Sequence, residues 1–290
     1  MLNALVGEKL AIVTHKPQTT RTRIQGIINA PRKKGRNAAQ IVLVDTPGVH
    51  RSATSLDKKM MQEIRDALHG CDLILMIADA TQLPREDKFV LDLIKNGDTP
   101  VFLLLNKIDL IEKGKLLAMI EQYRSMHDFK EIIPISARKK DGLDELLNVI
   151  VKALPEGPAY FPKDQITDQP ARFLAAESIR EQVLLETEKE VPYAATVLIE
   201  NFEEGEKLTR IAATIYIERE GQKAIIIGKG GQMLKKIGTG ARIQIEKMLG
   251  MKVFLELFVK VRPDWRESRE FIEGIDWRRQ LEDLMGAGRK

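Results

Sequence analysis

Short apolar runs alternate with amphipathic stretches of helical length between residues 38 and 153. The runs read AAQIVLV (38–44), CDLILMIA (71–78), TPVFLLL (99–105) and EIIPI (131–135). Nearly continuous runs of this kind are typical of parallel strands that are buried on both faces. The stretches between them, and GLDELLNVIVKAL after the last one, repeat their apolar residues at helical spacing. This alternation predicts a doubly wound α/β sheet. Ahead of it, RTRIQGIINA (21–30) and the basic loop PRKKGRN predict an antiparallel hairpin with the first run.

The order of the elements changes after residue 154. Residues 155–170 contain four prolines and predict a linker. A long amphipathic helix follows, then two strand patterns at 193–201 and 209–220, a short helix, a glycine-rich loop, a second helix and a last strand at 252–261. We therefore predict two domains, at 1–154 and 171–290, of which the second is a compact α-β-β-α-α-β unit with a C-terminal tail.

Charge is distributed unevenly along a chain whose formal net charge is +4. Residues 1–40 hold eight Lys and Arg against one acid, and residues 228–290 hold fourteen against nine. Two basic regions around an acidic middle are the pattern of a polyanion binder, unless the charges are only solvated faces. No apolar run approaches the roughly 18 residues that span a bilayer. The single cysteine, Cys71, excludes an internal disulfide, and the four histidines lie too far apart in sequence to indicate a metal site.

Polar motifs follow three of the predicted strands, at the edge where open α/β sheets bind ligands. They comprise Asp45, Thr46, Pro47, Gly48 and Val49 in DTPGV, Asn106, Lys107, Ile108 and Asp109 in NKID, and Ser136 and Ala137 in PISAR. One carboxylate, that of Asp109, can accept the two adjacent N–H donors of guanine, which adenine lacks. Asn106 can bond the base and tie neighbouring loops, the stem of Lys107 can cover the ring, and the N–H of Ala137 can meet the guanine oxygen. Taken singly, DTPG is also an ordinary turn and NKID an ordinary helix entry.

Together, in this order and each on its own strand, the motifs resemble the signature of the translation-factor-like GTPases. KPQTTRTRI (16–24) resembles the switch I segment of the Era, TrmE and Der group, in which a threonine reaches Mg²⁺ when GTP is bound. The resemblance implies GTP or GDP and Mg²⁺ as cofactors. Thr20 and Asp45 are the expected metal residues, with Thr19 as the second candidate, and Thr20 and Gly48 are the expected switch residues.

No catalytic side chain can be named from the sequence. Val49 stands where Ras-like enzymes place the glutamine that orients the attacking water, which fits slow hydrolysis. His50 is the neighbouring polar candidate, and an exposed loop histidine is the alternative.

The sequence departs from this family at its beginning. Members start with a strand, a phosphate loop of the pattern G-x-x-x-x-G-K-[ST], and a helix that commonly reads like LLNAL. Here LNALV follows Met1 at once, and the pattern has no match in the 290 residues. We therefore expect a chain that begins inside the first helix, binds guanine nucleotides poorly, hydrolyses almost nothing and exposes a sheet edge.

The glycine-rich loop in IIIGKGGQMLKK (225–236) follows a different pattern. A short helix, a G-x-x-G loop and a second helix, placed inside an α-β-β-α-α-β unit, resemble a KH domain of the prokaryotic arrangement. The expected RNA-binding residues are Gly228, Lys229, Gly230, Gly231, Lys235, Lys236 and Arg242. A KH groove holds about four unpaired nucleotides, so single-stranded RNA is the expected ligand.

A GTPase domain of this group followed by a KH domain is the arrangement of the Era-like GTPases, which the chain resembles over nearly its whole length. The resemblance implies a GTP-hydrolysing enzyme that binds a single-stranded segment of small-subunit ribosomal RNA and assists assembly of the small ribosomal subunit. It also implies a cytoplasmic protein with some peripheral contact with the membrane, and we expect a monomer.

Two readings of the missing phosphate loop stay open. The chain is either a nucleotide-independent RNA-binding protein with a remnant GTPase domain, or a fragment or misplaced start of a normal enzyme. The intact base and switch motifs favour the second reading. A further departure is the loop APRKKGRN (30–37), longer and more basic than in the family. It is either an RNA contact or a solvated hairpin tip.

Overall fold

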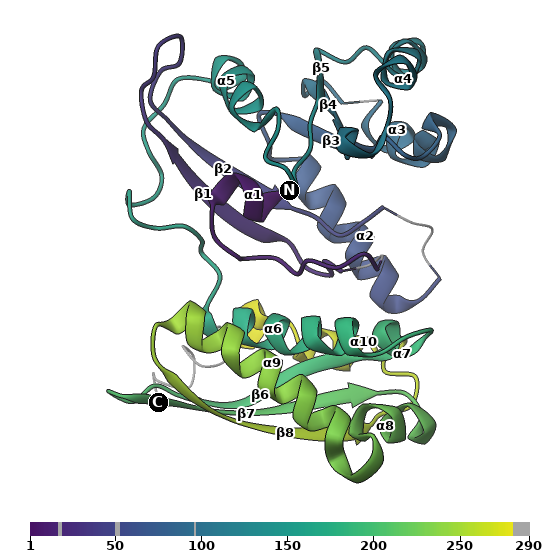
Figure 1. Cartoon of the computed structure of the whole chain (residues 1–290), viewed down its shortest axis with the longest axis vertical. Coiled ribbons are helices and arrows are strands. Elements are labelled where there is room, and N and C mark those ends of the chain that lie inside the picture. Colours follow the sequence, from purple (N-terminus) through teal and green to yellow (C-terminus); the bar gives the residue numbers. More distant parts are fainter. Residues whose placement is uncertain (17–18, 50–52, 96, 281–290) are drawn as a thin grey trace. The chain divides into compact units, whose positions relative to one another are not determined.

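The computed structural model describes residues 1–16, 19–49, 53–95 and 97–280, which form two compact units (Figure 1). The first unit comprises Met1–Leu10, Arg23–His50 and Gln62–Asp168, and the second comprises Ala11–Thr22, Arg51–Met61 and Gln169–Lys290. Two segments from the N-terminal part of the chain therefore belong to the second unit. The limits of two contiguous domains, at 154 and 171, stay a prediction.

The first unit contains two sheets. β1 (Ile24–Ala30) and β2 (Ala39–Asp45) form the predicted antiparallel hairpin. β3 (Ile74–Asp79), β4 (Val101–Asn106) and β5 (Glu131–Pro134) form a parallel sheet in that order. The run 101–105 of the central strand β4 is buried throughout, as its continuous hydrophobicity predicts. Among the described strands β3 pairs only with β4, and its Ile77 side chain is 46% exposed.

Amphipathic helices supply the rest of the first unit. They are α1 (Leu2–Val6), α2 (Ser55–Leu68), which begins in the second unit, α3 (Lys88–Ile94), α4 (Lys113–Met126) and α5 (Leu143–Ala153), with short 3-10 turns η1 (Pro84–Asp87) and η2 (Ile108–Leu110). Leu146 and Ile150 of α5 are fully buried and pack in one core with Phe102, Leu104 and Ile135 of the sheet. Burial of this helix face holds the carboxyl ends of β4 and β5 in a fixed position.

The proline-rich linker is bound along the hairpin of the first unit. The N–H of Ile27 donates to the carbonyl of Ile166 at 2.8 Å, and the Thr167 hydroxyl donates to the carbonyl of Gln25 at 2.6 Å. The side-chain oxygen of Gln40 accepts the N–H groups of Tyr160 and Phe161 at 2.8 and 2.9 Å. The linker therefore follows a defined path, because an edge strand offers its unpaired backbone groups.

The second unit has the predicted α-β-β-α-α-β order. β6 (Thr196–Glu203) pairs antiparallel with β7 (Leu208–Ile217), which pairs parallel with β8 (Lys252–Val261). Its helices are α6 (Ala171–Glu186), α7 (Val191–Ala194), α8 (Glu220–Ile227), α9 (Gln232–Leu249) and α10 (Arg269–Gly274), and η3 (Lys229–Gly231) precedes α9. The sequence pattern did not predict α7 or α10.

Helices α6 and α9 cover one face of this sheet (Figure 1). Ile179 of α6, Ile215 of β7 and Ile245 of α9 are completely buried in the shared core. The two helices approach closely at Gly240, where an added Cβ would lie 2.3 Å from the side-chain oxygen of Gln182. A larger residue at this contact would require the Gln182 side chain to move.

The segment after β8 is part of the second unit's packing. Trp265 is fully buried, and its Nε1–H donates to the carbonyl of Ala194 at 2.7 Å. It shares a small core with Leu56 and Met60, which come from α2, and with Phe271. The predicted tail thus anchors the segment 53–61. No helix in the described ranges is both long and apolar enough to cross a bilayer.

Candidate functional site

The predicted base-binding motifs meet at the carboxyl edge of the parallel sheet. The register places Asp79 at the end of β3 opposite Asn106 at the end of β4. The N–H of Ala137 donates to Oδ1 of Asn106 at 3.0 Å, and the Ser136 hydroxyl donates to Oδ1 of Asp109 at 2.7 Å. The structure therefore brings NKID and the PISAR motif into one hydrogen-bonded group. Since the Ala137 N–H already bonds Asn106, the predicted contact with the guanine oxygen would share or replace that bond.

Lys107 has a backbone conformation that side chains rarely adopt. Its φ of 70° lies in the left-handed region, which costs a non-glycine residue free energy and is common at functional sites. Its ammonium lies 2.5 Å from Oδ2 of Asp79, whose Oδ1 accepts the N–H and hydroxyl of Thr81. Burial alone would raise the pKa of Asp79, but these hydrogen bonds outweigh it and lower that pKa. Asp79 was not predicted as a site residue, although a carboxylate at a strand's carboxyl end was the available signal.

The nearby 3-10 turn ties the loops together. The N–H of Ile108 donates to the carbonyl of Ile135 at 3.3 Å, which joins NKID to the end of β5. Lys107 and Asp109 are exposed, whereas Asn106 and Ile108 are half-buried. The group fits a guanine base, because an oriented carboxylate and the stem of a fixed lysine lie at an accessible edge.

The DTPG motif follows β2 in the first unit. Asp45 is the last residue of the strand, opposite Ile24, and Thr46 to Val49 continue as a loop. Pro47 is buried and Gly48 is exposed, with no atom within 4 Å of an added Cβ. Packing among the described residues therefore does not require a glycine here, and the predicted approach of a phosphate to Gly48 stays a prediction. His50 lies outside the described residues.

The two predicted metal residues belong to different units. Asp45 is in the first, and Thr20, which is buried, is in the second. No group of three or more His, Cys, Asp or Glu side chains with the makings of a metal site occurs among the described residues. The roles of Thr20 and Asp45 toward Mg²⁺ therefore stay a prediction.

The segment 11–22, which includes most of the predicted switch I, is bonded to helices of the second unit. The N–H of Val13 donates to Glu181 at 2.8 Å, Lys16 donates to the carbonyls of Leu184 and Thr187, and Arg180 donates to the carbonyl of Thr19. These contacts were not predicted, since most of them end on backbone carbonyls.

Arg21 makes the most specific of the contacts from this segment. Its guanidinium donates to the carbonyls of Ala195 and Tyr193 at 2.7 and 2.8 Å and lies 5.7 Å from the centre of the Trp265 ring. Burial, and then the nearby Arg180, lower the pKa of Arg21 to about 9. The segment is thus held by a cation whose charge nearby acids of the second unit only partly neutralise.

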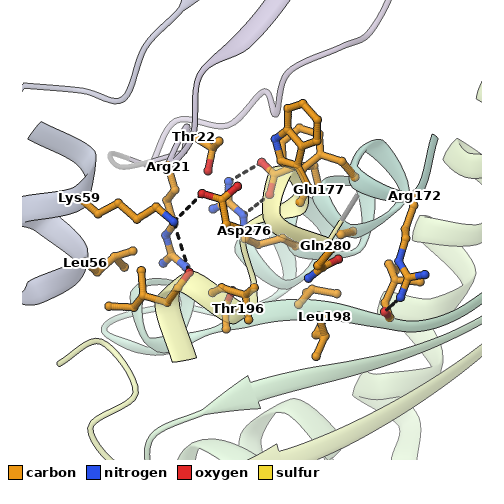
Figure 2. A pocket seen from close by; sticks show the side chains of 18 of the residues that line it. Arg21, Thr22, Leu56, Lys59, Arg172, Glu177, Thr196, Leu198, Asp276 and Gln280 are labelled. Carbon is orange, nitrogen blue, oxygen red and sulfur yellow. Dashed lines mark hydrogen bonds and ion pairs between the residues drawn. The ribbon is translucent and has the colours of Figure 1, made fainter. Parts of the chain in front are cut away.

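The start of α2 is bonded to the same unit. The N–H of Leu56 donates to the carbonyl of Arg266 at 2.9 Å, and the Lys59 ammonium lies 2.6 Å from Oδ2 of Asp276. Figure 2 shows Lys59, Asp276 and Arg21 around a cavity of about 100 Å³ that both segments help to line. The segment that follows DTPG and the segment that includes most of the predicted switch I therefore line one cavity of the second unit.

The glycine-rich loop joins α8 to α9. Gly228, Gly230 and Gly231 have φ values of 72°, 58° and 79°, which explains three glycines in four residues. An added Cβ at Gly228 would also lie 2.6 Å from Cβ of Met233. The loop therefore turns tightly and presents its exposed Gly230 and Lys229 at the start of a long helix.

The four predicted RNA-binding cations differ in their partners. Lys236 lies 2.5 Å from a Glu186 oxygen and Arg242 lies 3.0 Å from a Glu246 oxygen. Lys229 and Lys235 are exposed, and no ion pair to either occurs within the described residues.

Ile225, three residues before the loop, is 48% exposed and was not predicted as a site residue, although the IIIG run was its signal. An apolar side chain beside unpaired lysines suits a ligand with both bases and phosphates.

Comparison with family models divides the chain in two. Residues 1–107 match the model described as 50S ribosome-binding GTPase, and residues 190–266 match the KH domain model. The first match covers the DTPG motif and ends at Lys107 within NKID, and the second covers the glycine-rich loop.

Similar proteins match over nearly the whole chain. GTPase Era of Geobacter metallireducens is 49% identical over 280 residues, which are 96% of this chain and 92% of the relative. GTPase Era of Syntrophus aciditrophicus is 50% identical over 278 residues, which are 93% and 89% of the two chains.

Solved structures of the same kind share the fold. Era in complex with MgGDPNP and nucleotides 1506–1542 of 16S ribosomal RNA matches with a TM-score of 0.90 and 41% identity, over 95% of this chain and 93% of the other. A variant of Aquifex aeolicus Era bound to GDP and AlF₄⁻ matches with a TM-score of 0.89 and 41% identity, with the same coverage. The doubly wound GTPase-like fold followed by a KH fold is thereby confirmed.

Proposed function

Because the chain belongs to the GTPase Era family, we propose that it binds guanine nucleotides through its first unit and single-stranded small-subunit ribosomal RNA through its second. The observation that carries the nucleotide half is the 2.7 Å hydrogen bond that orients Asp109 from Ser136. The hydroxyl orients the carboxylate by donating to one of its oxygens, and the remaining acceptor positions can meet the two donors of guanine.

The groups around Asp109 would hold the base. The stem of Lys107 would cover the ring while Asp79 anchors its ammonium, and Asn106 would keep the NKID loop joined to the loop after β5. Asp45 and Thr20 would hold Mg²⁺, which neutralises charge on the terminal phosphates when it is bound with the nucleotide. GTP hydrolysis is the reaction of the family, and Val49 supplies no polar group to orient water, so we expect it to be slow.

The glycine-rich loop supports the RNA half of the proposal. Left-handed glycines let the backbone approach phosphates, and Lys229 and Lys235 add unpaired charge at the start of α9. The similar Era structure that contains nucleotides of 16S ribosomal RNA supports small-subunit RNA as the ligand. Assistance in assembly of the small subunit follows from that ligand as part of the proposal.

Coupling between nucleotide and RNA would pass through the segments 11–22 and 53–61. The first contains Thr20 and the second follows DTPG, both of which are expected to sense the nucleotide, and both segments are bonded within the unit that carries the glycine-rich loop. A nucleotide that repositions these segments would change their bonds to Ala195 and Asp276, and would thereby shift the conformational equilibrium of the second unit.

The remaining expectations concern the whole protein. We propose a cytoplasmic monomer with peripheral contact with the membrane, supported by the basic character of the chain's two ends. Sedimentation equilibrium and fractionation of cells at low and high salt test these points. A stable dimer, or a protein that salt does not release from membranes, would contradict them.

Fluorescent GDP tests the nucleotide half. The printed sequence has no phosphate-loop match, so the 290-residue chain should bind at least about 1,000-fold more weakly than a phosphate-loop chimera, because several charge-assisted hydrogen bonds are lacking. The phosphate-loop chimera is this chain preceded by the strand and loop of the Geobacter metallireducens relative. If the chimera also fails to bind, guanine recognition by Asp109 is wrong, and a nucleotide-independent RNA-binding protein remains.

Anisotropy of a short single-stranded RNA tests the other half. Lys229→Asp with Gly230→Asp should reduce its affinity by about 100-fold or more, since two negative charges would face the phosphates. Lys113→Asp with Gly114→Asp is the matched control, because this pair is exposed on α4 of the first unit. Equal loss in both variants would mean that net charge, and not the loop, governs binding.

A further inference from the structure

The tip of the β1–β2 hairpin lies near α5 in the first unit (Figure 1). Residues of this tip and of the last turn of α5 line a cavity of about 200 Å³. It is lined by Arg32, Lys33, Gly35, Arg36, Asn37, Val151 and Lys152. Four of these seven residues are cations and none is an acid. Such a lining attracts anions and has no carboxylate to repel them.

Arg36 is a buried cation that has no counterion in the part of the chain that the structure describes. Its side chain is buried, with the residue 5% exposed, and its Nη1 donates only to the neutral side-chain oxygen of Asn148 at 3.3 Å. Its Nε–H is buried and has no hydrogen-bond partner among the described residues. No carboxylate within the described ranges pairs with it. A buried charge and an unused donor are both costly, so the arrangement favours an anion in the adjoining cavity.

The cavity is held open by its own backbone. Lys33 and Arg36 exchange two backbone hydrogen bonds of 3.0 Å across a tight turn, in which Gly35 has a φ of 83°. The Lys33 ammonium also lies 3.4 Å from Asp144 of α5, at the solvent-exposed side. A ligand would therefore meet a formed site and would not need to order the loop.

We propose that this cavity binds a phosphate of the RNA backbone, as a second contact in addition to that of the glycine-rich loop. The inference rests on the proposed RNA-binding function. A polyanion fits better than a single phosphate, because Arg32 of the lining and Lys34 between two lining residues are exposed and offer charge for neighbouring phosphates. The tip residues 31–37 include no aliphatic or aromatic side chain except Pro31, so they lack the apolar group that inserts into a lipid interface.

The test compares two RNAs on the full chain. An eight-nucleotide single strand suffices for the glycine-rich loop, and the RNA corresponding to nucleotides 1506–1542 in the similar Era complex offers further phosphates. Arg36→Gln with Lys152→Gln should weaken binding of the long RNA about tenfold at 0.1 M salt and reduce the slope of log affinity against log salt by about 1.5, because two phosphate contacts are lost. Binding of the short RNA should not change.

Control variants separate the site from general charge and from folding. Lys113→Gln with Lys115→Gln removes the same charge from exposed positions of α4 and should leave both affinities unchanged. If loss of buried Arg36 unfolds the first unit, Arg32→Gln with Lys152→Gln replaces two exposed lining residues and should still weaken the long RNA. Unchanged affinity and salt slope in both cavity variants would overturn the proposal.

Two further arms distinguish other sources of the anion. If phosphate raises the melting temperature of the unmodified chain but not of the Arg36 variant, while RNA binding is equal in both, the site takes free phosphate and the RNA proposal is wrong. The proposal is also overturned if the cavity variants lose binding to vesicles with 30% phosphatidylserine but bind RNA as the unmodified chain does. Failure of the unmodified chain to bind the short RNA contradicts the proposed function itself, whatever the cavity variants do.

Discussion

The hydroxyl of Ser136 donates to Oδ1 of Asp109 at 2.7 Å and thereby joins the loop after β5 to the loop after β4. Both loops leave the sheet at its carboxyl edge, and the neighbouring bond from the N–H of Ala137 to Asn106 repeats the connection. The carboxylate is exposed but oriented. It can therefore present acceptors to a base without first losing side-chain freedom.

Asp109→Asn should exchange the base preference of the phosphate-loop chimera. An amide has one acceptor and one donor, so it no longer matches the two donors of guanine but matches the carbonyl that xanthine has in place of the amino group. We expect the affinity for GDP to fall about 100-fold and that for xanthosine diphosphate to rise, as charged hydrogen bonds are lost and neutral ones gained. Competition against a fluorescent nucleotide measures both.

Asp128→Asn is the matched control for this exchange. Asp128 is exposed in the segment before β5 and has no place in the base group, so its substitution should change neither affinity. Weaker GDP binding without any gain for xanthosine diphosphate would show that Asp109 supports the loop and does not read the base.

Ser136→Ala should weaken GDP binding by the chimera about fivefold to tenfold, since one hydrogen bond that orients the carboxylate is removed. The preference for guanine over xanthine should persist, because Asp109 remains. Ser125→Ala is the control, as its hydroxyl bonds the carbonyl of Gln122 within α4. An unchanged GDP affinity would mean that the carboxylate needs no orientation.

Much of the fold could be predicted because its signals are local. The buried run of β4 and the amphipathic face of α5 follow from hydrophobic period alone, and the strand 252–261 has the predicted bounds. α7 and α10 were missed because four and six residues carry too few periodic positions. The path of the linker was missed because its hydrogen bonds join backbone groups, which every residue has.

In the candidate site, too, some residues could be predicted from the sequence and some contacts could not. Asn106, Asp109 and Ser136 were predicted since polar residues at successive strand ends must meet at one edge. The docking of segment 11–22 on the second unit could not be predicted, because Arg21 bonds carbonyls that are more than 170 positions away in sequence. The cavity beside Arg36 required the structure, since burial distinguishes this arginine from its exposed neighbours.

Gly228→Ala should destabilise the second unit more than Gly250→Ala. Gly250 (φ 69°, ψ 14°) is left-handed, so its variant should lose about 1 kcal/mol of unfolding free energy. Gly228 (φ 72°, ψ 177°) has a backbone conformation that is essentially restricted to glycine, so its variant should lose about 1 to 3 kcal/mol from the backbone alone. Only at Gly228 would the added Cβ lie 2.6 Å from Met233, and we expect at least about 1 kcal/mol more there. Chemical denaturation measures the difference. Equal losses would show that the loop can shift away from Met233.

Arg21→Gln should uncouple RNA affinity from the bound nucleotide in the chimera. Glutamine is too short to reach both carbonyls that Arg21 bonds, so segment 11–22 would lose its firmest attachment to the second unit. Affinity for the short RNA should then be the same with GDP and with a non-hydrolysable GTP analogue. Arg23→Gln is the control, because Arg23 pairs with Glu63 in the first unit. A nucleotide effect that survives in Arg21→Gln would exclude this segment as the route.

The effect of Arg21→Gln on the free energy of unfolding should depend on pH. Burial and the neighbouring Arg180 lower the pKa of Arg21 in the folded chain to about 9, so above that pH the unfolded chain binds more protons than the folded one. The free energy of unfolding therefore rises with pH above that value. Below it, the folded chain carries the full free-energy cost of the desolvated Arg21 charge, and this cost does not change with pH. The unfolding free energy of the unmodified chain minus that of Arg21→Gln should increase between about pH 9 and 11, by at most about 1.4 kcal/mol per unit. Urea denaturation at half-unit intervals measures it, and a difference that stays flat or falls would mean that the guanidinium is well solvated in the folded state.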